Sequence, residues 1–406
     1  MDLIPIFKRV IGLDIHQSQV TACAIIENED GTKVIERRRF GPFKSDRRAL
    51  AEWCAAHRPD EVVMESTGIY WKSPYAALEK VGIRAKVVNA RHVKQVPGRK
   101  TDIADAEWLA MLARAGLLRG SFVPPAKFRE LRIVARQRQK IGGQLSAEKN
   151  RLHKVLADAG IRLAVVVSDL NGQSARAMIE ALIAGATPNE ALVFASRRLK
   201  ATPDQLREAL DGELTAAHRF VLEELLVHIK ELEERIARFD AYLLAELQSE
   251  HNALVLLQTS PGIDLIGAAM LLVEIGCDMT AFGNADRLAS WVGICPGNNE
   301  SAGKRKSGRM RKGNPYVRRL LCEFAHAARK TRCAFKAKYE SLAPRLGCKR
   351  ATMAVAHKML RTIFCMLQRQ QPYRDSATNY EALLVARNAP RWIKALERHG
   401  FLRATA

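Results

Sequence analysis

Short β-branched runs that alternate with helical segments dominate the N-terminal part of the chain. Val10–Ile15 and Val20–Ile26 are brief, apolar and rich in Val and Ile, which is the pattern of buried strands. Lys33–Phe40 alternates polar and apolar residues and predicts a third strand. Further helices and strands are then expected in alternation, at Ser45–His57, Glu61–Glu65, Tyr70–Val81, Ala85–Asn89 and about Thr101–Leu117. A three-strand meander followed by strand–helix alternation predicts an α/β fold, a mixed sheet flanked by helices.

Helical spacing covers the middle of the chain. Lys127–Ala159 predicts one long basic helix. Phe220–Leu247 carries apolar residues at steps of three and four over three heptads, at Leu222, Leu225, Ile229, Leu232, Ile236, Phe239 and Leu243. Such a seam fits either a helix packed within its own domain or a coiled-coil stalk or dimer seam, and the charged flanks favour the second. We therefore expect a helical, coiled-coil middle region.

The last third of the chain favours helices again. Leu256–Gly276 predicts two helices around a Pro-Gly turn, and a Gly-, Asn- and Ser-rich loop follows at Gly293–Gly313. Basic amphipathic helices are expected at Pro315–Arg332 and Lys349–Arg369. These changes of pattern predict an α/β domain at 8–125, a helical region at 126–250, a mainly α domain at 251–375 and a tail at 376–406.

Positive charge is the clearest compositional bias. The chain has 65 Lys and Arg against 43 Asp and Glu, a formal net charge of +22. Residues 301–350 alone hold sixteen basic and two acidic residues. An excess of this size favours a polyanion, and the charges are interleaved with Gly, Ser and aromatic residues rather than with the apolar stripe of a membrane-binding helix. Nucleic acid is therefore the expected partner, ahead of an anionic membrane or a merely solvated surface.

Three further features bear on where such a protein works. The longest apolar runs are far shorter than the ~20 residues of a transmembrane helix. The N-terminus has neither the apolar stretch nor the small-residue cleavage pattern of a secretory signal. The eight cysteines include no C-x-x-C pair, which argues against a zinc ribbon or a disulfide scaffold. We expect a cytoplasmic protein with no membrane partner.

Four carboxylates lie in or next to predicted secondary structure, two in apolar strands where burying a charge is unfavourable and two at the start of a helix. Asp14 lies in the first apolar strand and Glu65 ends another. Asp102 and Asp105 lie three residues apart at a helix start. Each alone has an ordinary explanation, such as a turn or a helix cap. Together, in this order of elements, they can converge on one point of a ribonuclease-H-like sheet, where Mg²⁺ between them would relieve their repulsion and two ions about 4 Å apart would support in-line phosphoryl transfer.

A polar loop contains the other candidate. Asn298–Gly303 leads directly into the basic residues Lys304, Arg305 and Lys306. A hydroxyl at Ser301 would be exposed among cations able to hold a phosphate. Composition alone fits an idle surface serine as well. No histidine lies near in sequence to act as a base, so activation of the serine would have to come from elsewhere, such as a metal site.

Long ordered motifs connect these acids and this serine. IGLDIHQSQV, VVMESTGIYW and GRKTDIADAEWLA resemble the three acidic signatures of the DEDD-type insertion-sequence transposases, recombinases guided by a bridge RNA. SPGIDLIGAAMLLVEIG and SWVGICPGNNESAGKRKSGRMRKGNPYVRRLL are similar to the C-terminal transposase domain of that family. The similarity spans about Val10–Arg119 and Leu256–Arg332 and leaves the helical middle weakly diagnostic.

The resemblance implies an RNA-guided DNA transposase of an insertion sequence, associated with the nucleoid. The acids of the family fall on Asp14, Glu65, Asp102 and Asp105, which would bind Mg²⁺ in a ribonuclease-H-like domain resembling a Holliday-junction resolvase. The nucleophile falls on Ser301, which would attack a DNA phosphodiester and form a covalent phosphoserine. The implied partners are double-stranded donor and target DNA, a structured noncoding bridge RNA, and further copies of the chain in dimers and a tetramer. Family members often have Ser-x-Gly-Gly, whereas this chain keeps a single glycine there.

Basic residues around both candidate sites are expected to bind nucleic acid. Arg99 and Lys100 precede Asp102 and could hold the scissile phosphate, although ordinary solvated charge explains them nearly as well. The other members of this set follow the serine: Lys304, Arg305, Lys306, Arg309, Arg311, Lys312, Arg318 and Arg319.

Two other functions fit the same residues. A junction resolvase would use metal-activated water and leave Ser301 idle. A basic RNA-binding protein would carry the acids as structural groups. An actin-like ATPase, which can also begin with IGLDI, is excluded because the HQSQ segment after it lacks the Gly- and Thr-bearing phosphate turn.

Overall fold

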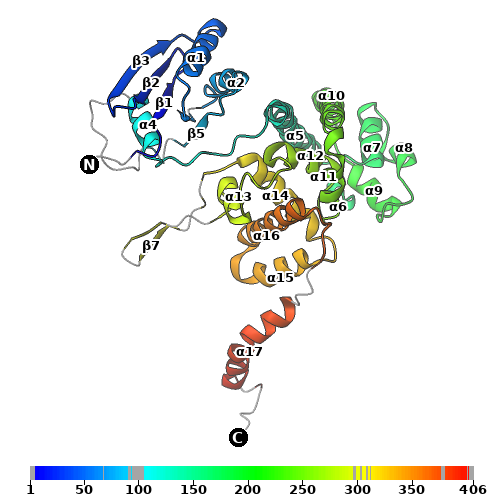
Figure 1. Cartoon of the computed structure of the whole chain (residues 1–406). Helices are drawn as coiled ribbons and strands as arrows, with labels where there is room; N and C mark the ends of the chain where they lie inside the picture. The colour runs from blue at the N-terminus through cyan, green and yellow to red at the C-terminus, as the bar shows by residue number, and fades with distance from the viewer. Residues whose placement is uncertain are drawn as a thin grey trace. The chain divides into compact units, whose positions relative to one another are not determined.

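The chain folds into two compact units, Met1–Ala126 and Lys127–Ala406 (Figure 1). The computed structural model describes residues 5–66, 68–89, 93, 105–295, 299–301, 304–307, 310, 312–375, 380–399 and 401, with backbone alone at 299–301, 304–307, 380, 381 and 384. The first unit is a sheet flanked by helices, and the second is mostly helical. The finer division expected at 126–250, 251–375 and 376–406 stays a prediction.

A five-stranded mixed sheet forms the first unit. Its strands are β1 (Arg9–Ile15), β2 (Val20–Glu27), β3 (Lys33–Phe40), β4 (Glu61–Glu65) and β5 (Lys86–Val88). They lie in the order β3-β2-β1-β4-β5. The first three are antiparallel neighbours, while β4 is parallel to β1 and β5 to β4. Among the described residues, the helices of this unit are α1 (Lys44–Ala56), α2 (Lys72–Lys80) and α4 (Asp105–Arg114).

The central strands are buried on both faces of the sheet, because they are apolar on both sides, whereas the edge strand β3 is mostly exposed. Leu13 and Met64 belong to the core under α1 and α2. Val10 and Val63, which alternate with them, belong to the core under α4. The expected meander and the strand–helix alternation after it are confirmed, and the architecture is compatible with a ribonuclease-H-like domain.

The second unit is a set of helices with one small hairpin. Its longer helices are α5 (Ala126–Asp158), α7 (Gln173–Ile183), α9 (Pro203–Leu210), α10 (Ala216–Glu246), α11 (His251–Gln258), α12 (Leu265–Ile275), α13 (Ala285–Val292), α14 (Pro315–Ala328), α15 (Ala334–Leu346), α16 (Cys348–Arg369) and α17 (Tyr380–Arg398). Short turns of helix are α6 (Leu163–Val166), α8 (Pro188–Ala191), η1 (Leu192–Phe194) and η2 (Gln248–Glu250). The hairpin strands are β6 (Asn299–Ser301) and β7 (Lys304–Ser307).

The heptad seam of α10 packs within its own chain. α5 and α10 are joined in antiparallel fashion by two ion pairs, Arg138–Asp240 and Lys149–Glu233, both at 2.8 Å. Four of the seam residues are fully buried: Leu222, Ile229, Leu232 and Leu243. The dimer seam favoured from the heptad spacing is therefore wrong for these residues. The reason is that apolar spacing specifies a buried stripe but not whether the partner helix belongs to the same chain.

α16 is the central helix of the C-terminal part of the second unit. It buries Val355, Met359 and Ile363 and packs against α13, α14 and α15. None of the helices in the described part of the chain has the length and apolar character needed to cross a bilayer.

Candidate catalytic residues on the sheet and the hairpin

Asp14 and Glu65 lie at the carboxyl ends of two neighbouring strands. β1 and β4 run parallel, with Leu13 opposite Met64. The next residue of each strand, Asp14 or Glu65, therefore reaches the same level of the sheet. Because side chains alternate along a strand, both acids lie on the face opposite to Leu13 and Met64, which is the face that α4 covers. Register thus sets the two acids side by side.

Gly12 allows the helix that carries the third acid to lie directly on the sheet. A Cβ atom at this position would stand 2.1 Å from the carbonyl oxygen of Ala106, so the backbones of α4 and β1 are in contact and a larger residue would displace α4. Asp105, the first residue of α4, immediately precedes this contact. Gly12 is in turn two residues from Asp14. Asp102 lies outside the described residues.

The carboxylate of Asp14 has a histidine as its neighbour. Nε2 of His16 lies 3.0 Å from Oδ2 of Asp14, whose side chain is only 19% exposed. Among the residues that the structure describes, no group of three or more His, Cys, Asp or Glu side chains is arranged to hold a metal ion. The predicted donors are all carboxylate oxygens, which is the donor chemistry of Mg²⁺. Since Asp102 is not among the described residues, magnesium binding by the full set stays a prediction.

An ion pair that the sequence did not predict attaches α4 to β3. Nε and one terminal nitrogen of Arg37 donate to the same oxygen of Glu107, at 3.0 and 2.6 Å. This hydrogen bond raises the pKa of Arg37. Burial, followed by the charge of Glu107, raises the pKa of the nearby Cys23 thiol to about 11. The only signal in the sequence is the polar alternation of β3.

Ser301 ends the first strand of a β-hairpin, where the sequence predicted a loop. β6 and β7 are antiparallel, with Ser301 paired to Lys304 and Glu300 paired to Arg305. The register is irregular between Asn299 and Glu300. Residues 302 and 303 connect the strands and lie outside the described residues. The hairpin brings the backbone of the predicted nucleophile level with that of the first basic residue after it.

Two family profiles match the chain. One, for DEDD transposases of the IS110 type and described as a transposase, matches residues 11–161. The other is described as the transposase IS116/IS110/IS902 family and matches residues 254–340. The chain belongs to the IS116/IS110/IS902 family of transposases. The two matched regions include all five predicted catalytic residues, Asp14, Glu65, Asp102, Asp105 and Ser301.

Curated relatives of the transposase agree with this family. The transposase for insertion sequence element IS1111A of Coxiella burnetii is 24% identical over 377 residues, which cover 91% of this chain and 92% of that protein. A "Probable family 20 transposase" of Pseudomonas aeruginosa is 26% identical over 326 residues, 78% of this chain and 86% of its own. The insertion element IS900 uncharacterized 42 kDa protein of Mycobacterium paratuberculosis is 30% identical over 168 residues, 40% of this chain and 41% of its own. DNA transposition, and hence a DNA partner, follow from the family.

The predicted nucleic-acid-binding residues of the transposase are described unevenly. Arg99, Lys100, Arg309 and Arg311 lie outside the described residues, and Lys304, Arg305 and Lys306 are described only as the backbone of β7. Lys312 is exposed. Arg318 is half-buried on α14, and Arg319 donates from Nε to Glu323 at 2.9 Å. Arg319 thus already has an acidic neighbour with which a phosphate would compete.

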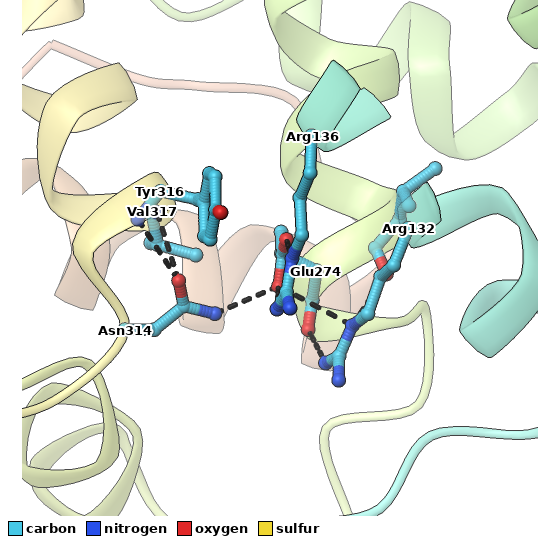
Figure 2. A network of polar contacts seen from close by, with 7 residues as sticks. Arg132, Arg136, Glu274, Asn314, Tyr316 and Val317 are labelled. Carbon is cyan, nitrogen blue, oxygen red and sulfur yellow. Dashed lines mark hydrogen bonds and ion pairs between the residues drawn. The ribbon is translucent and has the colours of Figure 1, made fainter. Parts of the chain in front are cut away.

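A buried polar cluster lies at the start of α14 (Figure 2). Glu274 of α12 is 1% exposed. It accepts two hydrogen bonds from Arg136 at 2.7 and 2.9 Å and one from Nδ2 of Asn314 at 2.7 Å, and Nε of Arg132 lies 3.2 Å from it. Burial alone would raise the pKa of Glu274, but its hydrogen bond with Arg136 and the charges of both arginines hold it below its ordinary value. Burial lowers the pKa of Arg132 to about 10.

Sequence reasoning missed this cluster. A signal was present, because Glu274 is the single charged residue of the otherwise apolar run Leu265–Ile275. A lone carboxylate in such a run requires buried partners. The sequence does not reveal which of the chain's 65 basic residues supply them.

Proposed function

We propose that this transposase cuts and rejoins DNA strands through a covalent phosphoserine at Ser301, assisted by its four acids and directed by a bridge RNA. The register of β1 and β4 carries the proposal, since it sets Asp14 beside Glu65 on the face that α4 covers. Acids gathered at one end of a mixed sheet suit a ribonuclease-H-like site for phosphoryl transfer.

In the proposed reaction, the hydroxyl oxygen of Ser301 attacks a phosphorus atom of the DNA backbone. The oxygen–phosphorus bond forms, the bond from phosphorus to the leaving sugar oxygen breaks, and that oxygen takes up a proton as the serine loses one. Attack by the hydroxyl of another strand reverses these steps, which frees the serine and joins the new strands without any external source of energy.

The acids serve this reaction in two ways. Asp14, Glu65, Asp102 and Asp105 would hold Mg²⁺, and a carboxylate among them would accept the proton of the serine. Bound Mg²⁺ would stabilise the negative charge that gathers on the phosphate oxygens. Without a metal ion, the carboxylate of Asp14 has His16 within hydrogen-bond distance. Metal binding by Asp14 would release this histidine.

Charge supports a role for RNA. The chain has a formal net charge of +22, and residues 301–350 carry sixteen basic residues. Such a surface can hold the backbones of a DNA duplex and of an RNA–DNA heteroduplex, whose A-form shape a protein reads without reading its bases. In the proposed assembly, dimers form a tetramer, and the acids of one subunit and the serine of another complete one site.

Ser301→Ala tests the nucleophile. The protein, purified with RNA transcribed from its own element, is incubated with DNA carrying the element's ends and Mg²⁺, then run on a denaturing gel. We expect a protein–DNA adduct that Ser301→Ala abolishes and that Ser307→Ala, a serine on the other strand of the same hairpin, leaves intact. Clean cleavage that survives Ser301→Ala would instead support a resolvase using activated water.

Asp14→Asn tests the acids separately. We expect it to remove adduct formation and strand exchange while DNA binding persists, because an amide is a poorer ligand and a far weaker base. Asp30→Asn is the control, since Asp30 lies in the exposed turn before β3 and bonds only Thr32 among its described partners. Full strand exchange by Asp14→Asn would make the acids structural.

A further inference from the structure

The hairpin that carries Ser301 lies in the sequence between α13 and α14. The end of α13 and the start of α14 touch each other, and we call these two segments the hairpin root. α13 ends at Val292 and α14 begins at Pro315. A Cβ atom at Gly313 would stand 2.3 Å from the carbonyl oxygen of Val292 and 2.5 Å from the nitrogen of Gly293. The chain that enters α14 therefore runs in contact with the chain that leaves α13.

The buried cluster of Figure 2 forms hydrogen bonds at the start of α14, which is one side of this root. We call it the root cluster, and its members are Arg132, Arg136, Glu274 and Asn314. Asn314 caps α14 by accepting hydrogen bonds from the backbone nitrogens of Tyr316 and Val317, at 3.0 and 3.3 Å. Its amide nitrogen donates to Glu274 at 2.7 Å. The guanidinium of Arg136 lies 4.5 Å from the centre of the Tyr316 ring.

The same cluster also touches the α13 side. The guanidinium of Arg132 lies 5.8 Å from the centre of the Trp291 ring, in the last turn of α13. Arg132 and Arg136 are one turn apart on α5, and α5 begins at Ala126, where the chain leaves the unit that carries the acids. One carboxylate thus ties α5 and α12 to both chain segments from which the hairpin emerges.

Stability alone does not account for a charge at this position. All of α12 from Gly267 to Ile275 is buried, and an apolar residue in place of a buried ion pair is often as stable or more so. α5 already has other attachments, such as the Arg138–Asp240 pair with α10. What an apolar residue could not supply is direction, because only hydrogen bonds fix the angle at which Asn314 and the start of α14 are held.

We propose that Glu274 and Asn314 are positioning residues for Ser301. They fix the direction in which the hairpin leaves its root and so hold the serine in line for attack. The inference rests on the proposed function of Ser301 and adds to it the residues that prepare the nucleophile.

Asn314→Ser separates this role from helix capping. Serine is a comparable N-cap, so α14 keeps its first-turn hydrogen bond, but the shorter side chain does not reach Glu274. Asn284→Ser is the matched control, because Asn284 caps the neighbouring α13 by accepting from the backbone nitrogen of Arg287 at 2.9 Å. The rate of adduct formation at saturating DNA, the dissociation constant for DNA and the Tm are measured for each variant of the RNA-loaded protein.

We expect Asn314→Ser to slow adduct formation by on the order of 10²-fold while its dissociation constant for DNA matches the wild type, because a misdirected nucleophile reacts slowly on DNA that is still bound. Asn284→Ser should react at the wild-type rate. Glu274→Gln should lose rate in the same way, and Asp240→Asn, which weakens the α5–α10 pair, should not. If Glu274→Gln fails to fold, the Asn314→Ser and Asn284→Ser pair still decides.

A wild-type rate in Asn314→Ser would overturn the inference while leaving the proposed function intact. A rate loss that all four variants share in proportion to their fall in Tm would also overturn it, because that pattern marks general destabilisation. Failure of the proposed function has a different signature: the wild type forms no adduct, or the adduct persists in Ser301→Ala, and both proposals then fall.

Discussion

The sheet of the first unit and the hairpin root of the second hold their candidate residues by opposite means. On the sheet, Asp14 and Glu65 are set by strand register, and α4 rests on the bare backbone of Gly12 between apolar layers. At the root, the buried carboxylate of Glu274 is paired with two half-buried arginines, Arg132 and Arg136. One region is organised by close apolar packing and the other by directed charge.

The difference follows from what each region must fix. A sheet supplies the direction of its own side chains, so the acids need only a covering helix at the correct distance. Among the residues that the structure describes, β6 and β7 pair only with each other, and the segments that flank them touch where Gly313 meets Val292 and Gly293. Hydrogen bonds to Asn314 provide the direction that apolar contacts would leave free.

The sharpest way to break this comparison is Glu274→Leu. Removing the buried carboxylate leaves the half-buried Arg132 and Arg136 without their charged partner, so we expect the second unit to lose about 3 kcal/mol of unfolding free energy or more. Urea unfolding, with a probe in each unit, measures the loss. Asp240→Asn, at a partly exposed pair of the same helix α5, should cost far less. Equal losses in the two variants would mean that the root has no special dependence on charge.

In the first unit, the free energy of unfolding should fall at high pH, because its apolar core contains a buried thiol. Burial raises the pKa of the Cys54 thiol from 9.0 to about 12. The folded state thus keeps the thiol neutral where the unfolded chain ionises it, so the stability it contributes is complete below pH 9 and is lost as the pH rises toward 12. At pH 11 the expected loss is roughly 3 kcal/mol.

Cys54→Ala isolates that effect, because it removes the thiol from the core under α1. Urea unfolding of the wild type and the variant between pH 7 and 11 gives the difference in free energy of unfolding at each pH. The advantage of the wild type should shrink above pH 9. A difference that stayed constant across this range would contradict the expectation that the thiol is shielded from ionisation.

The sequence was sufficient where structure depends on local pattern. Acids at or near the ends of apolar strands made Asp14 and Glu65 candidates, and the meander with strand–helix alternation predicted the mixed sheet that contains them. The face they share follows from alternation once β1 and β4 are known to be parallel neighbours. Family motifs add Ser301, which composition alone left open.

The sequence did not predict features that depend on which distant residues a segment packs against. The seam of α10 has the spacing of a dimer, yet helices of the same chain, α5 and α7 among them, cover it. The β6–β7 hairpin was predicted as a loop because its basic, Gly-flanked strands lack β-branched residues. The root cluster joins residues 132, 136, 274 and 314, and nothing local to any one of them identifies the others.

The smallest expected effect tests the close packing of α4 on β1 in the first unit. In Gly12→Ala the added Cβ meets the carbonyl oxygen of Ala106, a backbone atom that cannot rotate away, so α4 must shift. We expect the first unit to lose about 1–3 kcal/mol of unfolding free energy. Gly142→Ala is the control with the opposite sign: it lies inside α5, its nearest neighbour is an Arg138 nitrogen at 4.0 Å, and it should stabilise the second unit by ~0.5–1 kcal/mol. If Gly12→Ala had no cost, the contact between α4 and β1 would not depend on a glycine. The Arg37–Glu107 ion pair, a directed contact like that of the root, would then be what keeps α4 in place over Asp14.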